Sequence, residues 1–144
     1  MRTVIAPLEP VVERQLAALD GPLCEVALGY VARLRMEPYL GHLLRRGLLG
    51  SYDVRAVYFD QESRPRELLG EHRGPLRLAS DDPSAGPRYR VVYRIAEAPM
   101  AGVRMVRVLA VGEGHASPGS EGAYRDAERL LRDQIKSDQE RRKR

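Results

Sequence analysis

Hydrophobic and polar positions alternate along residues 89–95, where Tyr, Val, Tyr and Ile are separated by Arg, Val and Arg. Alternation of period two, with aromatic and β-branched residues on one face, is typical of a half-buried β-strand. Residues 103–111 predict a more central strand, because their apolar side chains fall on both faces. The segment between them, residues 96–102, has a length suited to a hairpin loop. The pattern therefore predicts two neighbouring antiparallel strands.

Helical spacing replaces this alternation nearer the N-terminus. Apolar residues within 23–34 recur three or four positions apart, which would place them in one stripe along a helix. An earlier helix is predicted to begin at residues 8–10, because Pro10 fits a first helical turn, and to end at the Asp-Gly-Pro sequence of residues 20–22. Two helices joined by so short a break predict a helical hairpin. A last helix is predicted at residues 123–139.

Two further strands and an insertion complete the pattern. Residues 3–6 are predicted to form a short first strand, and residues 51–59 alternate as a second strand. Residues 60–87 have no regular pattern and carry prolines and charges, which predicts an insertion. This order predicts an α+β fold, in which the helical hairpin packs on one face of a mostly antiparallel sheet. A single domain of residues 1–138 would precede a basic tail of residues 139–144.

Composition limits the function classes without choosing among them. The chain of 144 residues is long enough for one domain with its own core, and no stretch approaches the ~20 apolar residues that span a bilayer. The N-terminus lacks the apolar run of a secretory signal, and the single cysteine cannot form an internal disulfide, so a cytoplasmic location is expected. The net charge of +4 is compatible with a polyanionic partner. The sequence predicts no metal site and no cofactor.

Four short motifs occur in order on the predicted elements. Residues 37–41 are an acidic-Pro connector after the second helix, and residues 50–55 read Gly-x-Tyr-x-x-Arg on the next strand. The Tyr-Arg-Val-Val-Tyr strand of residues 89–93 follows, and residues 112–124 form a loop from Gly to Tyr before the last helix. In this order the motifs resemble the RelE/ParE superfamily of bacterial toxins from toxin–antitoxin pairs. The resemblance implies a first strand, a helical hairpin, an antiparallel three-stranded meander and a C-terminal helix.

The ribonuclease branch of that superfamily cleaves mRNA on the ribosome by directing a 2′-hydroxyl at the adjacent phosphate. Such an endoribonuclease needs a base for the 2′ proton, an acid for the leaving 5′ oxygen and cations for the developing charge. Arginine suits the last role, because its fork binds two phosphate oxygens and stays protonated. The resemblance therefore implies two partners, a cognate antitoxin protein and mRNA on the ribosome.

The resemblance also implies site residues. Arg55 matches a basic position on the second strand, Arg90 matches the arginine of the third strand, and Tyr124 matches a tyrosine that stacks on or protonates the substrate. The position two residues after the loop glycine, usually an arginine, is Gly114 here. The neighbouring His115 is a substitute, because an imidazole titrates near neutral pH. The implied catalytic residues are Arg55, Arg90, His115 and Tyr124.

Two departures and a set of surface cations bear on this site. Asp53 stands where efficient relatives carry a second lysine, and a carboxylate there repels a phosphate backbone unless it is paired. The loop of residues 112–124 is longer than the family pattern. Basic residues near the motifs and in the tail are candidates for nucleic-acid binding. They are Arg45, Arg46, Arg88, Arg141, Arg142, Lys143 and Arg144.

Two other functions stay open on the same residues. A ParE-like toxin would share the fold and inhibit DNA gyrase without nuclease chemistry, which Asp53 and the missing Gly-x-Arg favour. A RelE-fold binding module without catalytic activity would use the insertion of residues 60–87 and the basic tail to contact a protein or nucleic acid. The nuclease is favoured by Arg90 and Tyr124 with His115 nearby.

Overall fold

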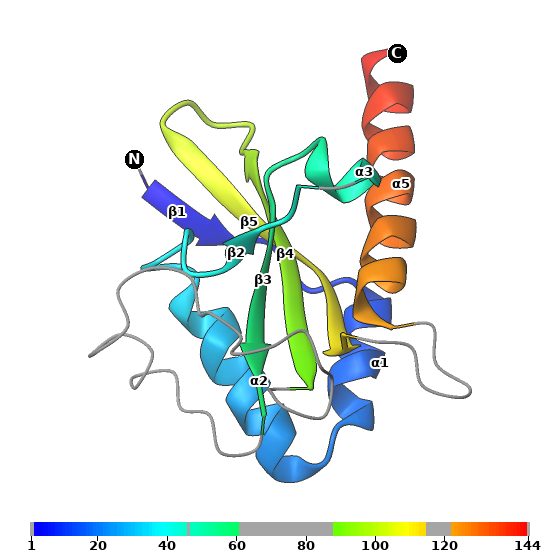
Figure 1. Ribbon diagram of the computed structural model, residues 1–144. Helices are drawn as coiled ribbons and strands as arrows, with labels where there is room; N and C mark the ends of the chain where they lie inside the picture. The colour runs from blue at the N-terminus through cyan, green and yellow to red at the C-terminus, as the bar shows by residue number, and fades with distance from the viewer. Residues whose placement is uncertain (1, 46, 61–87, 115–121, 144) are drawn as a thin grey trace.

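The computed structural model describes residues 2–45, 47–60, 88–114 and 122–143 as one sheet with helices on both faces (Figure 1). The strands are β1 (Arg2–Ile5), β2 (His42–Leu43), β3 (Val54–Phe59), β4 (Tyr89–Glu97) and β5 (Val103–Glu113). The helices are α1 (Pro10–Ala18), α2 (Gly21–Arg33), α3 (Gly47–Gly50) and α5 (Ala123–Arg142). The predicted α+β class is confirmed.

The sheet is mixed, with the strand order β1-β5-β4-β3-β2. Strand β1 runs parallel to β5, and the other neighbours are antiparallel. The expected hairpin between β4 and β5 is confirmed, and β5 is a central strand because β1 covers its other edge. The pairing changes from Val92–Ala110 to Tyr93–Val108, which leaves Leu109 as the extra residue of a bulge in β5.

The helical hairpin of α1 and α2 packs on one face of the sheet. Pro10 occupies the first turn of α1, and the Asp20 carboxylate caps α2 by accepting from the Leu23 N–H at 3.0 Å. Inward side chains of both helices, including the fully buried Val12 and Tyr30, form one core with alternate residues of β3, β4 and β5. The apolar stripe predicted for residues 23–34 is thus confirmed, and it packs in the core.

The opposite face of the sheet is buried as well, which the half-buried prediction for residues 89–95 missed. Helix α5 stands along this face, away from α2 (Figure 1), and its Ala127 and Leu131 pack with Val92 and Leu109. Because α5 covers this face, Arg90 is 3% exposed and Arg94 is 7% exposed. Arginines at alternate positions of β4 therefore lie beneath a helix instead of facing water.

Several boundaries differ from the sequence-based ones. The strand predicted at residues 51–59 begins at Val54, the residues between α2 and β3 contain β2 and α3, and α5 continues past residue 139 to Arg142. Residues 139–142, which were predicted to belong to a basic tail, thus form the last turn of α5. The insertion predicted at 60–87 lies outside the described residues except for Asp60. Among the described helices, none has the length and apolar character needed to cross a membrane.

Candidate functional site

Arg90 is the centre of a polar cluster on the α5 face of the sheet. It projects from β4, and its Nε donates to the hydroxyl oxygen of Tyr124, at the start of α5, over 3.1 Å. Its Nη1 donates to the Tyr89 carbonyl oxygen, also at 3.1 Å. The guanidinium carbon lies 4.1 Å from the centroid of the Tyr58 ring on β3, a cation–π contact. Three elements thus fix one arginine and one tyrosine in contact.

A glycine gives the Arg90 side chain its space. Gly114 donates its N–H to the Arg88 carbonyl oxygen at 2.9 Å, which brings its backbone alongside Arg90. A Cβ added at Gly114 would lie 2.8 Å from both Nε and Cζ of Arg90. The resemblance expects an arginine at this position, but the guanidinium of Arg90 already occupies the volume where that side chain would begin.

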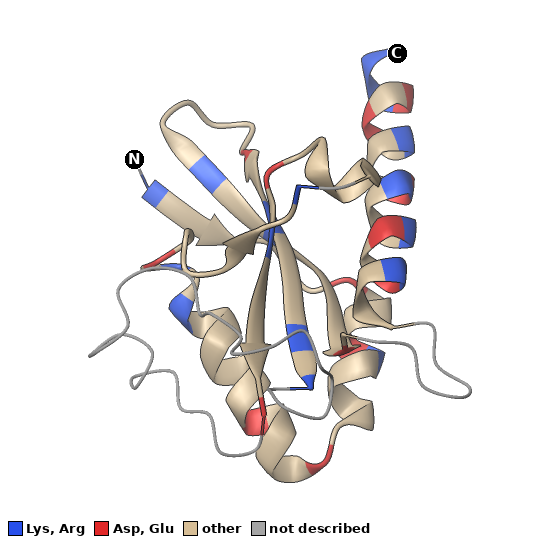
Figure 2. Ribbon diagram, viewed as in Figure 1, with Lys and Arg blue, Asp and Glu red and all other residues tan. Residues whose placement is uncertain are grey.

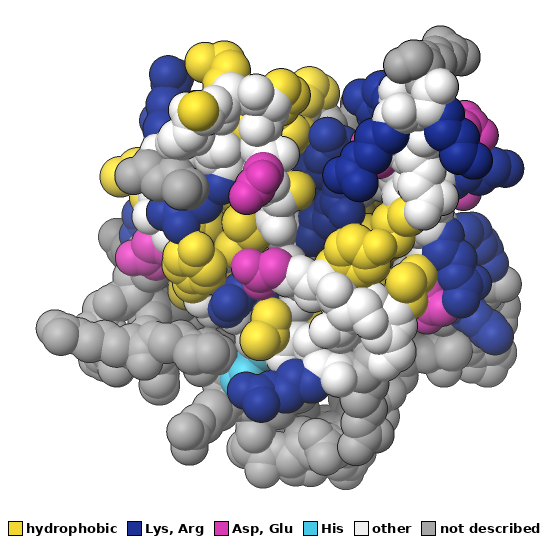
Figure 3. Space-filling view, turned by 90° about the horizontal axis from the view of Figure 1, so that it is seen from above, with side chains coloured by type: hydrophobic (Ala, Val, Ile, Leu, Met, Phe, Trp, Pro, Cys, Tyr) yellow, Lys and Arg dark blue, Asp and Glu magenta, His cyan; other side chains and the backbone are white. Residues whose placement is uncertain are grey.

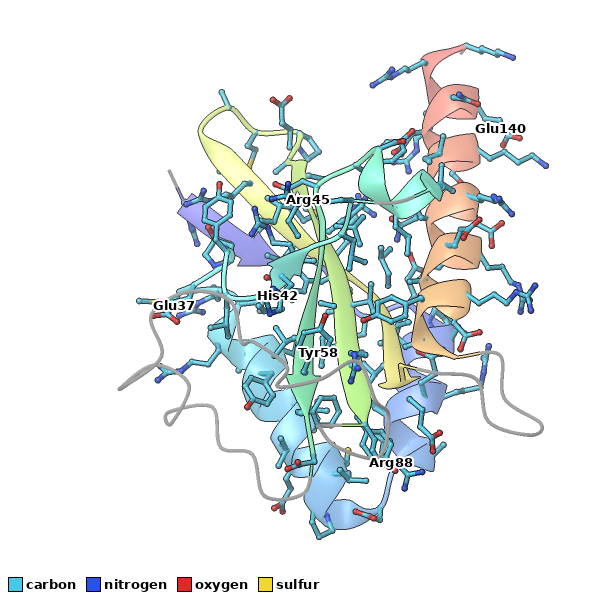
Figure 4. All side chains as sticks on the ribbon, viewed as in Figure 1. Glu37, His42, Arg45, Tyr58, Arg88 and Glu140 are labelled. Atoms are coloured by element: carbon cyan, nitrogen blue, oxygen red, sulfur yellow. The ribbon has the colours of Figure 1, made fainter. Side chains whose placement is uncertain are left out.

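His42 joins the cluster from the neighbouring strand. Its ring lies 5.2 Å from the ring of Tyr58, centroid to centroid, and Figure 4 shows the two side chains close together on β2 and β3. The sequence interpretation did not include His42. A strand of two residues has no periodicity, and β2 became recognisable only through its pairing with β3.

An apolar pocket of about 460 Å³ opens beside Tyr124. Its other lining residues come from β2, the following connector and α3: Leu43, Leu44, Arg45 and Leu49. Tyr124 therefore contacts Arg90 through its hydroxyl and also lines the pocket. Arg45 supplies a cation at the rim of the pocket, and it is exposed to solvent. Of these pocket residues, the sequence analysis had identified Arg45 and Tyr124.

Arg55 lies on the other face of the sheet from Arg90. It alternates with Val54 and Ala56, which pack beneath α5, and is opposite Tyr93 in the hairpin-side core. Its Nε donates to the Asp53 carboxylate at 3.0 Å. Its Nη1 donates to the Gly41 carbonyl oxygen at 3.3 Å, and its guanidinium lies 4.9 Å from the Tyr39 ring centroid. The implied catalytic residues Arg55 and Arg90 are thus separated by the sheet, and Asp53 neutralises Arg55.

The remaining basic candidates are spread over the molecule (Figure 2). Arg88 is exposed at the start of β4, at the lower end of the view in Figure 4. Arg141, Arg142 and Lys143 are exposed at the far end of α5, and Arg141 forms an ion pair with Asp138 at 3.1 Å. At 1.5 Å per residue, this end is roughly 25 Å from Tyr124, so these cations cannot share a phosphate with Arg90. Arg46, His115 and Arg144 lie outside the described residues.

The described residues contain no group of three or more His, Cys, Asp or Glu side chains that could hold a metal ion. The chain matches no family model, and comparisons with curated proteins and with solved structures give no match. The candidate site is therefore the cluster of Arg90, Tyr124, Tyr58 and His42, with the adjacent apolar pocket.

Proposed function

We propose that this chain is a RelE-like toxin that cleaves mRNA on the ribosome as an endoribonuclease, paired in the cytoplasm with an antitoxin protein. The observation that carries the proposal is the 3.1 Å hydrogen bond from Arg90 Nε to the Tyr124 hydroxyl, made beside a pocket. The order of elements supports it, because a first strand, a helical hairpin, the antiparallel strands β3, β4 and β5 and a last helix follow one another as the RelE/ParE resemblance implies.

The Arg90–Tyr124 pair has the chemistry that the leaving 5′ oxygen needs. Because the Tyr124 oxygen accepts from Arg90, its own proton is directed elsewhere and can pass to a leaving oxygen. The guanidinium behind the phenol places a permanent positive charge within a few ångströms of the phosphorus, where negative charge develops in the transition state. Tyr124 is the partly exposed member and touches the substrate, whereas Arg90 acts mainly from behind it.

The pocket supplies a place for a nucleobase next to the reacting phosphate. Leucine side chains and the Tyr124 ring give it an apolar, partly aromatic lining, which suits the flat face of a base. Arg45 at the rim is placed to pair with a backbone phosphate of the same strand. In this proposal His115 stays a candidate catalytic residue, because an imidazole that titrates near neutral pH suits proton transfer.

The experiment that tests the nuclease is mRNA cleavage by the purified protein, with and without ribosomes, beside Tyr124→Phe. This variant keeps the ring and removes the proposed acid, so ribosome-dependent cleavage should fall by about 10²–10⁴-fold. Tyr39→Phe is the matched control, because the Tyr39 hydroxyl also accepts from an arginine, Arg104 Nη1 at 2.7 Å, but this arginine lies on the other face of the sheet, beside Thr3 of β1. Its cleavage rate should equal that of the wild type.

A second function is favoured by the position of Arg55. Of the cations that the resemblance expects at the site, the described residues bring only Arg90 to Tyr124, because Arg55 faces the other way and Gly114 replaces an arginine. This arrangement favours a protein that does not cleave mRNA. Such a protein is either a ParE-like toxin that inhibits DNA gyrase or a binding module of the same fold. A folded protein that leaves mRNA intact on ribosomes would contradict the nuclease, and inhibition of gyrase supercoiling would then support the ParE-like alternative.

A further inference from the structure

Two arginines that belong to no motif meet beneath the C-terminal half of α5. Arg94 on β4 and Arg107 on β5 are direct partners across the antiparallel pair, so their Cβ atoms are about 5 Å apart on one face. Arg94 Nη2 lies 3.8 Å from the Asp138 carboxylate of α5, which places both guanidiniums on the α5 side of the sheet. Arg94 is 7% exposed, and Arg107 is partly exposed.

The positive charge of this pair exceeds the negative charge that faces it. Asp138 is the carboxylate that α5 brings to Arg94, and it is already shared with Arg141 through an ion pair of 3.1 Å. One turn earlier on the same helix, Gln134 is uncharged and 8% exposed. Among the described residues, Arg94 and Arg141 therefore share the Asp138 carboxylate, and Arg107 adds a third positive charge beside Arg94.

The hydrogen-bonding capacity of the cluster is also unfilled. Nε of Arg94 and Nε of Arg107 are both buried without a hydrogen-bond partner, and so is Oε1 of Gln134. A buried donor without a partner is costly, and more so on a charged group. Consistent with this, burial and the neighbouring charge of Arg107 lower the pKa of Arg94 below its ordinary value.

We propose that Arg94 and Arg107 form a binding site for a phosphate group, separate from the Arg90–Tyr124 cluster. A phosphate dianion matches both excess charges, and its oxygens can accept from the two free Nε–H donors at once. A carboxylate would balance one charge only. Arg107 and Asp138 are partly exposed, so the pair is not sealed from solvent. Figure 3, which looks down on this end of the molecule, shows Lys and Arg side chains gathered beside the hollow next to α5.

The site stands whether or not the protein cleaves RNA. Arg94 is four positions beyond Arg90 on the same face of β4, which at about 3.4 Å per residue separates the two by roughly 14 Å. A single phosphate cannot reach both arginines. The phosphate bound at Arg94 is therefore either a free one or a different phosphate of a nucleic-acid backbone.

The first arm of the test measures thermal unfolding and the Arg side-chain Nε–Hε NMR signals during titration with inorganic phosphate, against chloride of equal ionic strength. The wild type should gain roughly 5–10 °C in Tm at a hundredfold excess over Kd, and the Arg94 and Arg107 signals should shift. Arg107→Gln should lose this gain, while unfolding at an equal or higher Tm without phosphate, because a like charge beside Arg94 is removed.

Arg104→Gln is the matched control. It makes the same change three residues earlier on β5, but Arg104 projects to the other face, where its Nε donates to Thr3 at 2.8 Å. Its phosphate-dependent gain in Tm should equal that of the wild type. If Arg107→Gln keeps the full gain, phosphate binds elsewhere and the proposal is overturned.

The second arm uses a short single-stranded RNA with 2′-O-methyl groups, which cannot undergo cleavage. If inorganic phosphate gives no gain but Arg107→Gln weakens RNA binding about 5–10-fold and reduces the salt slope by about 1, with Arg104→Gln unchanged, the phosphate is that of a backbone. If neither ligand distinguishes Arg107→Gln from Arg104→Gln, there is no phosphate site at this pair.

Discussion

At the scale of single residues, Gly114 has a consequence for the candidate site that can be tested. In Gly114→Ala the new Cβ would lie 2.8 Å from Arg90 Cζ, and the atoms it meets belong to the end of a flexible side chain. We therefore expect the guanidinium to move away from Tyr124 while the fold persists. The Arg90 Nε–Hε NMR signal should shift, and cleavage, where present, should fall at least about 10-fold through the lost electrostatic contact.

Gly112→Ala provides the control for this prediction. Gly112 is the partner of Arg90 across the β4–β5 pair, but a Cβ there meets nothing within 4 Å. Its Arg90 signal and its activity should match the wild type, and the loss of a glycine should stabilise the protein by about 0.4–1 kcal/mol. An unchanged Arg90 signal in Gly114→Ala would contradict the close approach of the two residues.

Tyr93 has a buried hydroxyl that is held by two backbone groups. Its ring is fully buried, its hydroxyl donates to the Pro38 carbonyl oxygen at 2.7 Å, and it accepts from the Gly41 N–H at 2.9 Å. Burial raises the pKa of Tyr93 well above its usual range. In the folded protein this phenol therefore stays neutral at pH values where an unfolded tyrosine ionises.

The sign of the resulting pH dependence follows from this difference. Below about pH 10 both states hold the proton and the full stability is present; above it the unfolded state ionises first, so stability falls by about 1.4 kcal/mol per pH unit from this group. Tyr93→Phe should lose about 1–3 kcal/mol at pH 8, through two unsatisfied buried backbone groups, and should show a shallower decline above pH 10. Urea unfolding at pH 8, 10 and 11 measures both effects.

Tyr52→Phe is the comparison for that series, because Tyr52 is 38% exposed. Its stability at pH 8 and its decline above pH 10 should both resemble the wild type. Equal declines in Tyr93→Phe and the wild type would show that Tyr93 ionises normally in the folded state.

At the scale of elements, the sequence could predict what depends on local periodicity. The predictions for the apolar stripe of α2 and the inner face of β4 are confirmed. A helix or strand that is buried on one face repeats its apolar residues with its own period, and the sequence shows that period. The prediction that the outer face of β4 is exposed was wrong. Arginine is a polar residue and therefore indicates an exposed face, but Arg90 and Arg94 are buried on the side of the sheet where α5 packs. Local pattern distinguishes a face from its opposite but does not say what packs on it.

The grouping of the site residues could not be predicted either, because it depends on strand register. Alternation alone places Arg55 and Tyr58 on opposite faces of β3, and the motif alone selects Arg90 on β4. Whether Arg55 and Arg90 share a face depends on the pairing of Arg55 with Tyr93, which is a contact between distant residues. For the same reason β2 and the parallel pairing of β1 with β5 left no local signal.

At the scale of the whole molecule, the two faces of the sheet use their arginines differently. On the hairpin side, Arg55 and Arg104 both contact the Tyr39 ring and have oxygen partners, which include the carboxylate of Asp53. On the α5 side, Arg94 and Arg107 keep unfilled donors, and the tail of α5 adds more cations. Among these four arginines, the donors without a partner thus lie on the α5 side of the sheet.

This asymmetry predicts how binding of a single-stranded RNA responds to salt. Two triple variants each remove three positive charges. The first replaces Arg141, Arg142 and Lys143 by glutamine, and the second replaces Arg14, Arg33 and Arg35 by glutamine. Since all of the first set are exposed at the end of α5, the fold and Tm should change little. The first variant should reduce the slope of log K against log salt by about 2, because each lost phosphate contact removes about 0.7. The second variant, whose residues lie on α1 and at the end of α2, should keep the wild-type slope.

Both slopes are measured from 50 to 200 mM salt. Equal slopes in the two variants would mean that the protein binds RNA through its net charge and has no oriented binding face.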